Sequence, residues 1–318
     1  MKGKSSKLYA TWLDSLRTKF KSERSKYSND ESVKAHKKFA SKRIHSQLTD
    51  TNETVKITRC ELQVANDCLE DPSSVEQHVT LMLKEYSKNN PDTIIISDRM
   101  SRTYVSRRIF IKTNTTQVIL QRFFFFLAME IELFEEAMRI TGLDLKIKIT
   151  KFFQNRSEKI LEICKSKLPS IKKTSFLQTV NILLNGVGAS SNVDIEGQKI
   201  SAALLLLPVV FGEDIDRFIS INKNPQVSTP SITIRCAGET NIFSVDDAEI
   251  NVMLDGIVIV KSKTVSSAVT SLVAAYWVYE IAFDTKLKKT LDFVASHVCG
   301  VNNYIATPFS QRILNKLL

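Results

Sequence analysis

The stretch Ile-Asn-Val-Met-Leu-Asp-Gly-Ile-Val-Ile-Val (250–260) places an Asp-Gly pair between two apolar runs. This pattern is a strong signal for a β-hairpin, because a type I′ turn needs positive φ at both central residues. Upstream, Ile232, Ile234 and Cys236 alternate with polar residues, and 242–245 is another short apolar-leaning run. The sequence therefore predicts a small antiparallel sheet in this part of the chain.

Helical patterns lie on both sides of this predicted sheet. Apolar residues recur at helical spacing after it, in 265–276 and 285–299, and before it, in 200–211. The segment 214–221 is expected to continue as a short helix. The sequence predicts a predominantly helical α+β fold, in which helical N-terminal and middle regions precede a C-terminal unit of helices packed on a small antiparallel sheet.

The middle of the chain carries its own helix boundaries. Asp71-Pro72-Ser73-Ser74 is a helix start signal. The hydrophobic stretch 118–140 predicts a helix that ends at Gly142, and a further helix is expected over 145–167. The run Thr-Ile-Ile-Ile-Ser (93–97) is expected to be a short strand or an extended connector.

Three parts follow from these patterns. We expect a basic helical arm over 1–48, a helical domain over 55–168 and an α+β domain over 170–318. A polar linker over 49–54 separates the first two.

The formal net charge of +10 is concentrated in the arm, by which we mean residues 1–48. The arm holds 13 basic and 4 acidic side chains, whereas the remaining 270 residues hold 31 basic and 30 acidic ones. Such clustered cations can neutralise phosphates, so we expect the arm to bind nucleic acid or an acidic partner. The alternatives are a solvated helical face, a nuclear-localisation-like patch over 34–43, or contact with an anionic membrane surface. The expected binding residues are Arg17, Lys19, Lys21, Arg24, Lys34, Lys37, Lys38, Lys42 and Arg43.

The sequence favours an intracellular location, in the nucleus or the cytoplasm. Its five cysteines are odd in number and contain no CxxC pair, which is typical of a reducing compartment. The N-terminus has no apolar stretch of signal-peptide type. The uncharged run 264–279 is shorter than the roughly 20 residues that a membrane span needs.

Three arginines, Arg102, Arg107 and Arg108, lie close together in the sequence. They suggest either an anion pocket or structural ion pairs, since the guanidinium fork matches carboxylate as well as phosphate. We favour ion pairs with the glutamates of the following stretch, which are Glu130, Glu132, Glu135 and Glu136.

No catalytic, metal or cofactor site is predicted. His36, His45, His78 and His297 lack the spacing of metal ligands, and the 185–190 loop lacks the context of a phosphate-binding loop. A competing hypothesis is a metal-dependent nuclease or phosphoryl-transfer enzyme, because carboxylates near strand ends can bind Mg²⁺. Its candidate residues are Asp246, Asp247, Glu249 and Asp255. A third hypothesis is a copy of a mobile element without a conserved activity.

Five short segments resemble one protein family in their order and spacing. They are Leu-Arg-Thr-Lys-Phe-Lys-Ser-Glu-Arg (16–24), Ser-Arg-Thr-Tyr-Val-Ser-Arg-Arg (101–108), Leu-Leu-Pro-Val-Val-Phe-Gly-Glu-Asp (206–214), Val-Met-Leu-Asp-Gly (252–256) and Ala-Ala-Tyr-Trp-Val-Tyr-Glu-Ile-Ala-Phe (274–283). The family is the uncharacterised group, expanded in fishes and some invertebrates, labelled "sterile alpha motif domain-containing protein 3-like".

The resemblance implies a fold but no specific activity. Nothing in the chain is typical of the sterile alpha motif itself. Because the basic helix follows other domains in longer members of the family, the resemblance also implies a fragment or a truncated copy. The charge pattern and the absence of an assembled catalytic constellation in the sequence favour a non-enzymatic interaction protein, with no expectation about its oligomeric state.

Overall fold

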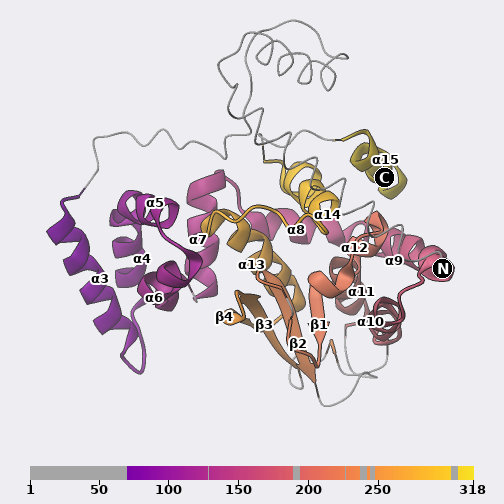
Figure 1. Ribbon diagram of the computed structural model, residues 1–318, viewed down its shortest axis with the longest axis horizontal. Helices are drawn as coiled ribbons and strands as arrows, with labels where there is room; N and C mark the ends of the chain where they lie inside the picture. The colour runs from indigo at the N-terminus through magenta and orange to yellow at the C-terminus, as the bar shows by residue number, and fades with distance from the viewer. Residues whose placement is uncertain are drawn as a thin grey trace, which may run out of the picture. The chain divides into compact units, whose positions relative to one another are not determined.

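The computed structural model describes residues 70–127, 129–188, 194–225, 227–236, 242–243, 248–301 and 307–318. All of them belong to the second of two compact units of the chain, Ile57–Leu318. In these ranges the protein is a predominantly helical α+β structure with one four-stranded sheet, as the sequence predicts (Figure 1).

The first described helix, α3 (Pro72–Tyr86), begins where the start signal predicts. The Asp71 carboxylate accepts hydrogen bonds from the backbone N–H groups of Ser73 and Ser74 at 2.9 and 3.0 Å. It thereby satisfies donors that the first helical turn leaves without partners.

The next segment corrects a prediction. Residues 93–97 form the first half of α4 (Thr93–Arg102), not a strand or an extended connector. The side chain of Asp92 caps this helix through the N–H groups of Ile94 and Ile95. Ile96 and Met100, four residues apart, are fully buried. The cap and this helical spacing outweigh the strand preference of three consecutive isoleucines.

Two long predicted helices are each divided. The stretch 118–140 lies in α6 (Thr116–Leu127) and α7 (Glu130–Thr141), which follow α5 (Tyr104–Thr113). Gly142 ends α7 in a left-handed conformation, with φ of 71°, as predicted. The segment 145–167 forms α8 (Leu145–Gln154) and α9 (Ser157–Lys167), with a break at Asn155 and Arg156.

Several short helices and turns connect α9 to the sheet. The 3₁₀ turn η2 (Leu168–Ser170) and α10 (Thr174–Asn185) come first, and α10 was not predicted. The apolar segment 200–211 is divided between α11 (Ile195–Leu205) and α12 (Leu207–Phe211), where Pro208 lies in the first turn. The segment 214–221 is not a continuous helix but the 3₁₀ turn η3 (Ile215–Arg217) followed by strand β1 (Ile219–Ile221).

The sheet has the order β1-β2-β3-β4 and is mixed. The strands β2 (Ser231–Cys236), β3 (Ala248–Leu254) and β4 (Ile257–Ser262) pair antiparallel, and β1 adds to β2 in parallel. Asp255 and Gly256 have φ of 50° and 77°, which confirms the predicted hairpin turn. In the predicted strand 242–245, Ile242 and Phe243 form a turn, and 244–247 lie outside the described residues.

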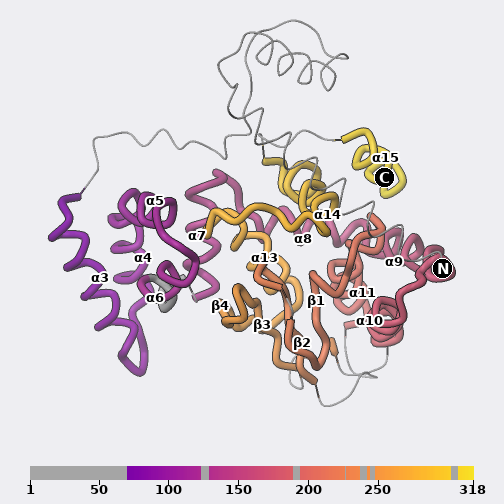
Figure 2. The backbone as a smooth tube through the Cα atoms, viewed as in Figure 1, coloured from indigo at the N-terminus to yellow at the C-terminus, as the bar shows by residue number. Residues whose placement is uncertain are grey.

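Helix α13 (Val265–Val278) is the centre of the core (Figure 2). It packs against β2, β3 and β4 and also against α7, α8 and α11. Twelve of its fourteen residues are buried, consistent with its lack of a polar face. The chain continues through α14 (Lys288–Phe293), the π-helix η4 (Val294–Cys299) and α15 (Pro308–Leu317). Within the described ranges, every helix is too short or too polar to cross a bilayer.

Candidate functional site

The predicted binding residues of the arm all lie outside the described residues. These are Arg17, Lys19, Lys21, Arg24, Lys34, Lys37, Lys38, Lys42 and Arg43. The arm as a binding site therefore remains a prediction from charge.

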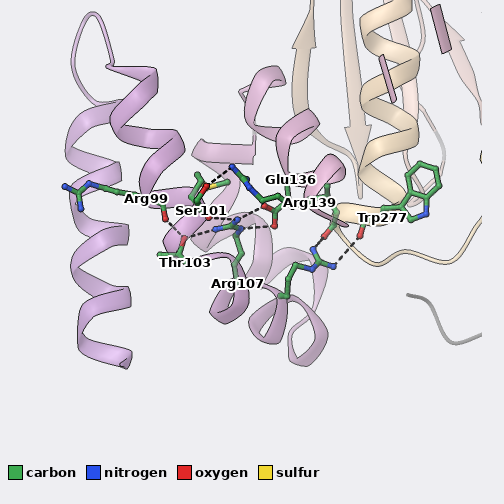
Figure 3. Close-up of polar contacts among 10 residues, drawn as sticks. Arg99, Ser101, Thr103, Arg107, Glu136, Arg139 and Trp277 are labelled. Atoms are coloured by element: carbon green, nitrogen blue, oxygen red, sulfur yellow. Dashed lines mark hydrogen bonds and ion pairs between the residues drawn. The ribbon is translucent and has the colours of Figure 1, made fainter. Parts of the chain in front are cut away.

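Arg107 on α5 is fully buried and forms a two-pronged ion pair with Glu136 on α7 (Figure 3). Its Nε and Nη2 atoms donate to the two carboxylate oxygens at 3.1 and 2.5 Å. The remaining hydrogen bonds run from Nη1 to the hydroxyl of Thr103 at 2.7 Å and from Nη2 to the carbonyl of Met100 at 2.9 Å. This guanidinium stabilises the fold rather than a bound ligand, because its N–H groups donate to oxygen atoms of the protein itself.

Glu136 also attracts a second cation. Arg139 lies one turn further along α7 and its Nη1 atom is 3.3 Å from the Glu136 carboxylate, while its Nη2 atom donates to the Ser101 hydroxyl at 3.2 Å (Figure 3). The network therefore ties α4, α5 and α7 together by charge-assisted hydrogen bonds.

Arg108 joins α5 to the end of α13. Its Nη1 atom donates to the Val278 carbonyl at 2.6 Å, and its Nη2 atom donates to the Glu280 carboxylate at 2.6 Å. The carbonyl ends of a helix carry partial negative charge, so a buried guanidinium is favourable there. Only 4% of the Arg108 side chain is exposed.

The prediction of structural ion pairs is confirmed in kind and corrected in detail. Arg107 pairs with one of the predicted glutamates, Glu136. Arg108 pairs instead with Glu280, and Arg102 pairs with Asp98 on its own helix at 3.0 Å. Among the predicted partners, Glu130 accepts a hydrogen bond from the Ser262 hydroxyl at 2.9 Å.

Glu132 is a buried carboxyl with an unsatisfied oxygen. Its Oε2 atom has no hydrogen-bond partner among the residues that the structure describes, and the residue is 1% exposed. Burial raises the pKa of this carboxyl, against the attraction of Arg139 and Arg107. Its negative charge is therefore stabilised less in the folded state than in the unfolded chain.

Glu132→Gln is expected to stabilise the protein more at pH 8 than at pH 4. Because the pKa of Glu132 is higher in the folded state, the free energy of unfolding falls as pH rises from the unfolded value of 4.5 through the folded value. Removing the charge should gain about 1 kcal/mol, or about 2–4 °C in Tm, at pH 8. Scanning calorimetry of both proteins at both pH values measures this difference. An equal shift at both pH values would contradict it.

The structure describes only two of the four carboxylates of the nuclease hypothesis, Glu249 and Asp255. Asp246 and Asp247 lie outside the described residues. Glu249 is exposed on β3 and accepts a hydrogen bond from the Asn251 side chain, and Asp255 is exposed in the hairpin turn. In the ranges given above, no three His, Cys, Asp or Glu side chains are placed to share a metal ion.

The histidines in these ranges are hydrogen-bonded within the fold. The Nδ1 atom of His78 lies 2.8 Å from Nη1 of Arg99, and its Nε2 atom lies 2.8 Å from the Glu70 carboxylate. Because Arg99 can only donate, the His78 Nδ1 atom must accept and its Nε2 atom carries the proton. His297 contacts the Ser310 hydroxyl at 3.1 Å. His36 and His45 lie outside the described residues.

A groove of about 1120 Å³ between α10 and β1 was not predicted. One wall carries Lys173, Ser175, Gln178, Thr179, Asn181, Ile182 and Asn185, and the other carries Asp216, Ile219, Ser220, Ile221, Asn222, Lys223 and Asn224. Most of these side chains are hydroxyls and amides, which can both donate and accept hydrogen bonds.

A polar cluster around Asp216 lines part of this groove. Its carboxylate accepts from the Ser175 hydroxyl at 2.8 Å and the Thr179 hydroxyl at 3.3 Å, and Lys173 lies 2.8 Å away. Burial pushes the pKa of Asp216 upward, but the hydrogen bonds from Lys173 and Ser175 outweigh it and hold the pKa below its usual value. Lys173 also pairs with Asp214 at 3.2 Å, so its charge is neutralised locally.

The groove could not be predicted, because the segments that form its two walls have weak sequence signals for their secondary structure. A strand of three residues is too short to show alternation, and the segment 214–221 has the apolar content of a short helix. The amides of α10 lie on one face of a helix, but this could not be seen in the sequence because the helix itself was not predicted.

Comparison with known proteins gives two relatives of the same name. The chain is 28% identical to sterile alpha motif domain-containing protein 3 from Homo sapiens over 301 residues, 92% of the chain and 54% of that protein. It is 28% identical to the Mus musculus protein over 289 residues, 89% of the chain and 53% of that protein. The chain thus spans about half the length of the curated relatives it matches.

Two other comparisons found no match. No protein-family model matches the chain, in agreement with the expectation that it lacks a sterile alpha motif. No solved structure matches it. The two relatives confirm the resemblance drawn from the sequence segments: over about nine-tenths of its length, this chain is similar to sterile alpha motif domain-containing protein 3.

Proposed function

We propose that this protein is a non-enzymatic intracellular interaction protein that binds a polyanionic partner through its basic arm. Nucleic acid is the first candidate for that partner, and an acidic protein surface is the alternative. The observation that carries the proposal is the charge division: 13 basic against 4 acidic residues in 1–48, and 31 against 30 in the rest of the chain. Clustered cations give salt-dependent affinity for phosphates through release of counterions.

The ion pairs outside the arm support the proposal that the arm provides the cations for binding. Arg102, Arg107 and Arg108, the densest group of arginines in the described ranges, all have carboxylate partners within the fold. A guanidinium whose donors are occupied by protein oxygens offers little to a phosphate. The cations of the arm are then the main source of affinity for a polyanion.

The test compares two full-length variants of equal charge. The arm variant replaces the nine expected binding residues with Gln. The body variant replaces nine exposed lysines for which the described structure shows no ion pair, also with Gln. These are Lys84, Lys112, Lys148, Lys151, Lys165, Lys172, Lys261, Lys263 and Lys286.

We expect the arm variant to bind a fluorescent 20-nucleotide RNA and a 20-base-pair DNA at least tenfold more weakly than the unaltered protein at 50 mM salt. The body variant should lose less than threefold, because dispersed lysines do not contact one phosphate backbone together. Gel-shift titration measures both. Binding of polyglutamate in place of both nucleic acids identifies the acidic-protein alternative, and equal losses in the two variants would contradict the proposal.

A further inference from the structure

Two lysines from different helices are joined through a pair of aromatic rings where α9, α12, α14 and α15 meet. The Lys167 ammonium, at the end of α9, donates to the Val210 carbonyl on α12 at 2.8 Å. The next residue of α12, Phe211, contacts the exposed ring of Phe309 on α15, with the two ring centroids 6.0 Å apart. The Lys289 ammonium of α14 lies 5.6 Å from the centroid of the Phe309 ring.

Lys316 adds a third ammonium group from α15. It follows Phe309 by seven residues, or about two helical turns, so both side chains lie on the same side of that helix. Burial lowers the pKa of Lys167, and the positive charges of Lys316 and Lys289 lower it further. Lys316 and Lys289 are therefore close enough to repel the Lys167 ammonium. We call Lys167, Lys289 and Lys316 the lysine cluster.

Among the described residues, no carboxylate forms an ion pair with the lysine cluster. Asp292 on α14 lies 3.6 Å from Lys288 instead. Glu213 accepts hydrogen bonds from two backbone N–H groups at the start of α14, at 2.9 and 2.8 Å. Arg107 and Arg108, by contrast, are each paired with a glutamate. Like charges that the fold leaves without counter-charges are typical of an anion site rather than of a structural ion pair.

We propose that the lysine cluster binds a ligand with two or more neighbouring phosphate groups, either free in solution or in a lipid headgroup. An ammonium group has three N–H donors, so Lys167 keeps two beyond the one that it donates to Val210. Charge-assisted hydrogen bonds to phosphate oxygens are strong, and a multivalent anion would also relieve the repulsion among the lysines. The Phe309 ring holds the Lys289 ammonium by a cation–π contact, which limits the freedom lost on binding. This site is separate from the arm and does not depend on the proposed function.

The test uses the full-length arm variant as its starting protein, so that the cations of the arm do not contribute. Calorimetric titration with tripolyphosphate at 50 mM salt measures binding. The cluster variant, in which Lys167, Lys289 and Lys316 are also replaced with Gln, should bind at least tenfold more weakly. The matched control replaces Lys84, Lys112 and Lys261 with Gln, removes the same charge and should bind within twofold of the starting protein.

A single exposed substitution separates a loss of binding from a loss of folding. Lys316→Gln should weaken tripolyphosphate binding at least threefold while its Tm without ligand equals or exceeds that of Lys84→Gln, because it removes a charge that repels Lys167. A lower Tm together with unchanged binding would show that Lys316 has only a structural role and would contradict the inference.

Sedimentation with phosphatidylcholine vesicles, with and without a phosphatidylinositol bisphosphate, distinguishes the two sources of phosphate. Cluster-dependent binding to the bisphosphate vesicles identifies a lipid headgroup, and cluster-dependent binding of tripolyphosphate alone identifies a soluble ligand. The three cluster substitutions made in the unaltered protein should leave RNA binding within threefold, so failure of this inference is distinct from failure of the arm. Binding of neither probe, or equal affinity of the cluster variant and the matched control, would overturn the inference.

Discussion

Glu136→Ala is expected to lower the free energy of unfolding by about 3–5 kcal/mol, because it leaves a buried guanidinium without its counter-charge. The Arg107 and Glu136 side chains are both fully buried, and two hydrogen bonds join them. The substitution also removes the partner of Arg139. The loss is far larger than the roughly 0.2–1 kcal/mol that is typical of an exposed ion pair, because solvent and salt screen the charges of an exposed pair.

Equilibrium unfolding in urea, followed by circular dichroism, measures this loss. The matched control is Glu158→Ala, which breaks the exposed ion pair with Lys199 and should leave the free energy of unfolding nearly unchanged. The double substitution Arg107→Met and Glu136→Leu should recover most of the stability, since it removes both charges together. A Glu136→Ala protein as stable as the Glu158→Ala control would show that the buried pair is not formed in solution.

Arg108→Met is expected to cost about 2–4 kcal/mol, because it leaves the Val278 carbonyl and the Glu280 carboxylate without their donor. Methionine keeps the apolar stem of the side chain, so the loss reports on the hydrogen bonds more than on packing. Arg108→Lys should be intermediate, since one ammonium does not reproduce the planar fork.

Hydrogen exchange distinguishes this loss from a general destabilisation. Amides near the end of α13, around Val278, should lose protection in Arg108→Met before the amides of β3 do, because Arg108 joins α5 to that end of the helix. Urea unfolding of the same protein gives the total cost. Uniform loss of protection over α13 and the sheet would contradict a local role.

The features that could be predicted from the sequence are those set by neighbouring residues. The Asp-Gly turn, the Asp71 cap and the Gly142 helix end each depend on the φ preference or the hydrogen-bonding side chain of one or two residues. Each was identified because its chemistry acts within four residues of its own position.

The features that could not be predicted depend on distant parts of the chain. Arg108 and Glu280 are 172 positions apart, so no local pattern links them. Strand β1 exists because β2 lies beside it, and the break between α8 and α9 divides a pattern that is apolar on both sides. The run 93–97 has the β-branched residues of a strand, so the cap that Asp92 forms on α4 was not predicted.

The candidate sites follow the same division. The arm was predicted from charge alone, which needs no knowledge of the fold. The pairing of Arg107 with Glu136 was expected in kind, because a glutamate-rich stretch follows the arginines. The groove between α10 and β1 was missed, because its two walls are brought together only by the tertiary structure.

The salt dependence of nucleic-acid binding tests the central claim most directly. For the unaltered protein and the body variant, the logarithm of the binding constant for the 20-base-pair DNA should fall steeply and in parallel with the logarithm of the salt concentration, by about 0.9 for each phosphate contacted. The arm variant should show a slope shallower by about three or more. Equal slopes for the arm variant and the unaltered protein would contradict the claim that the arm supplies the cations for binding.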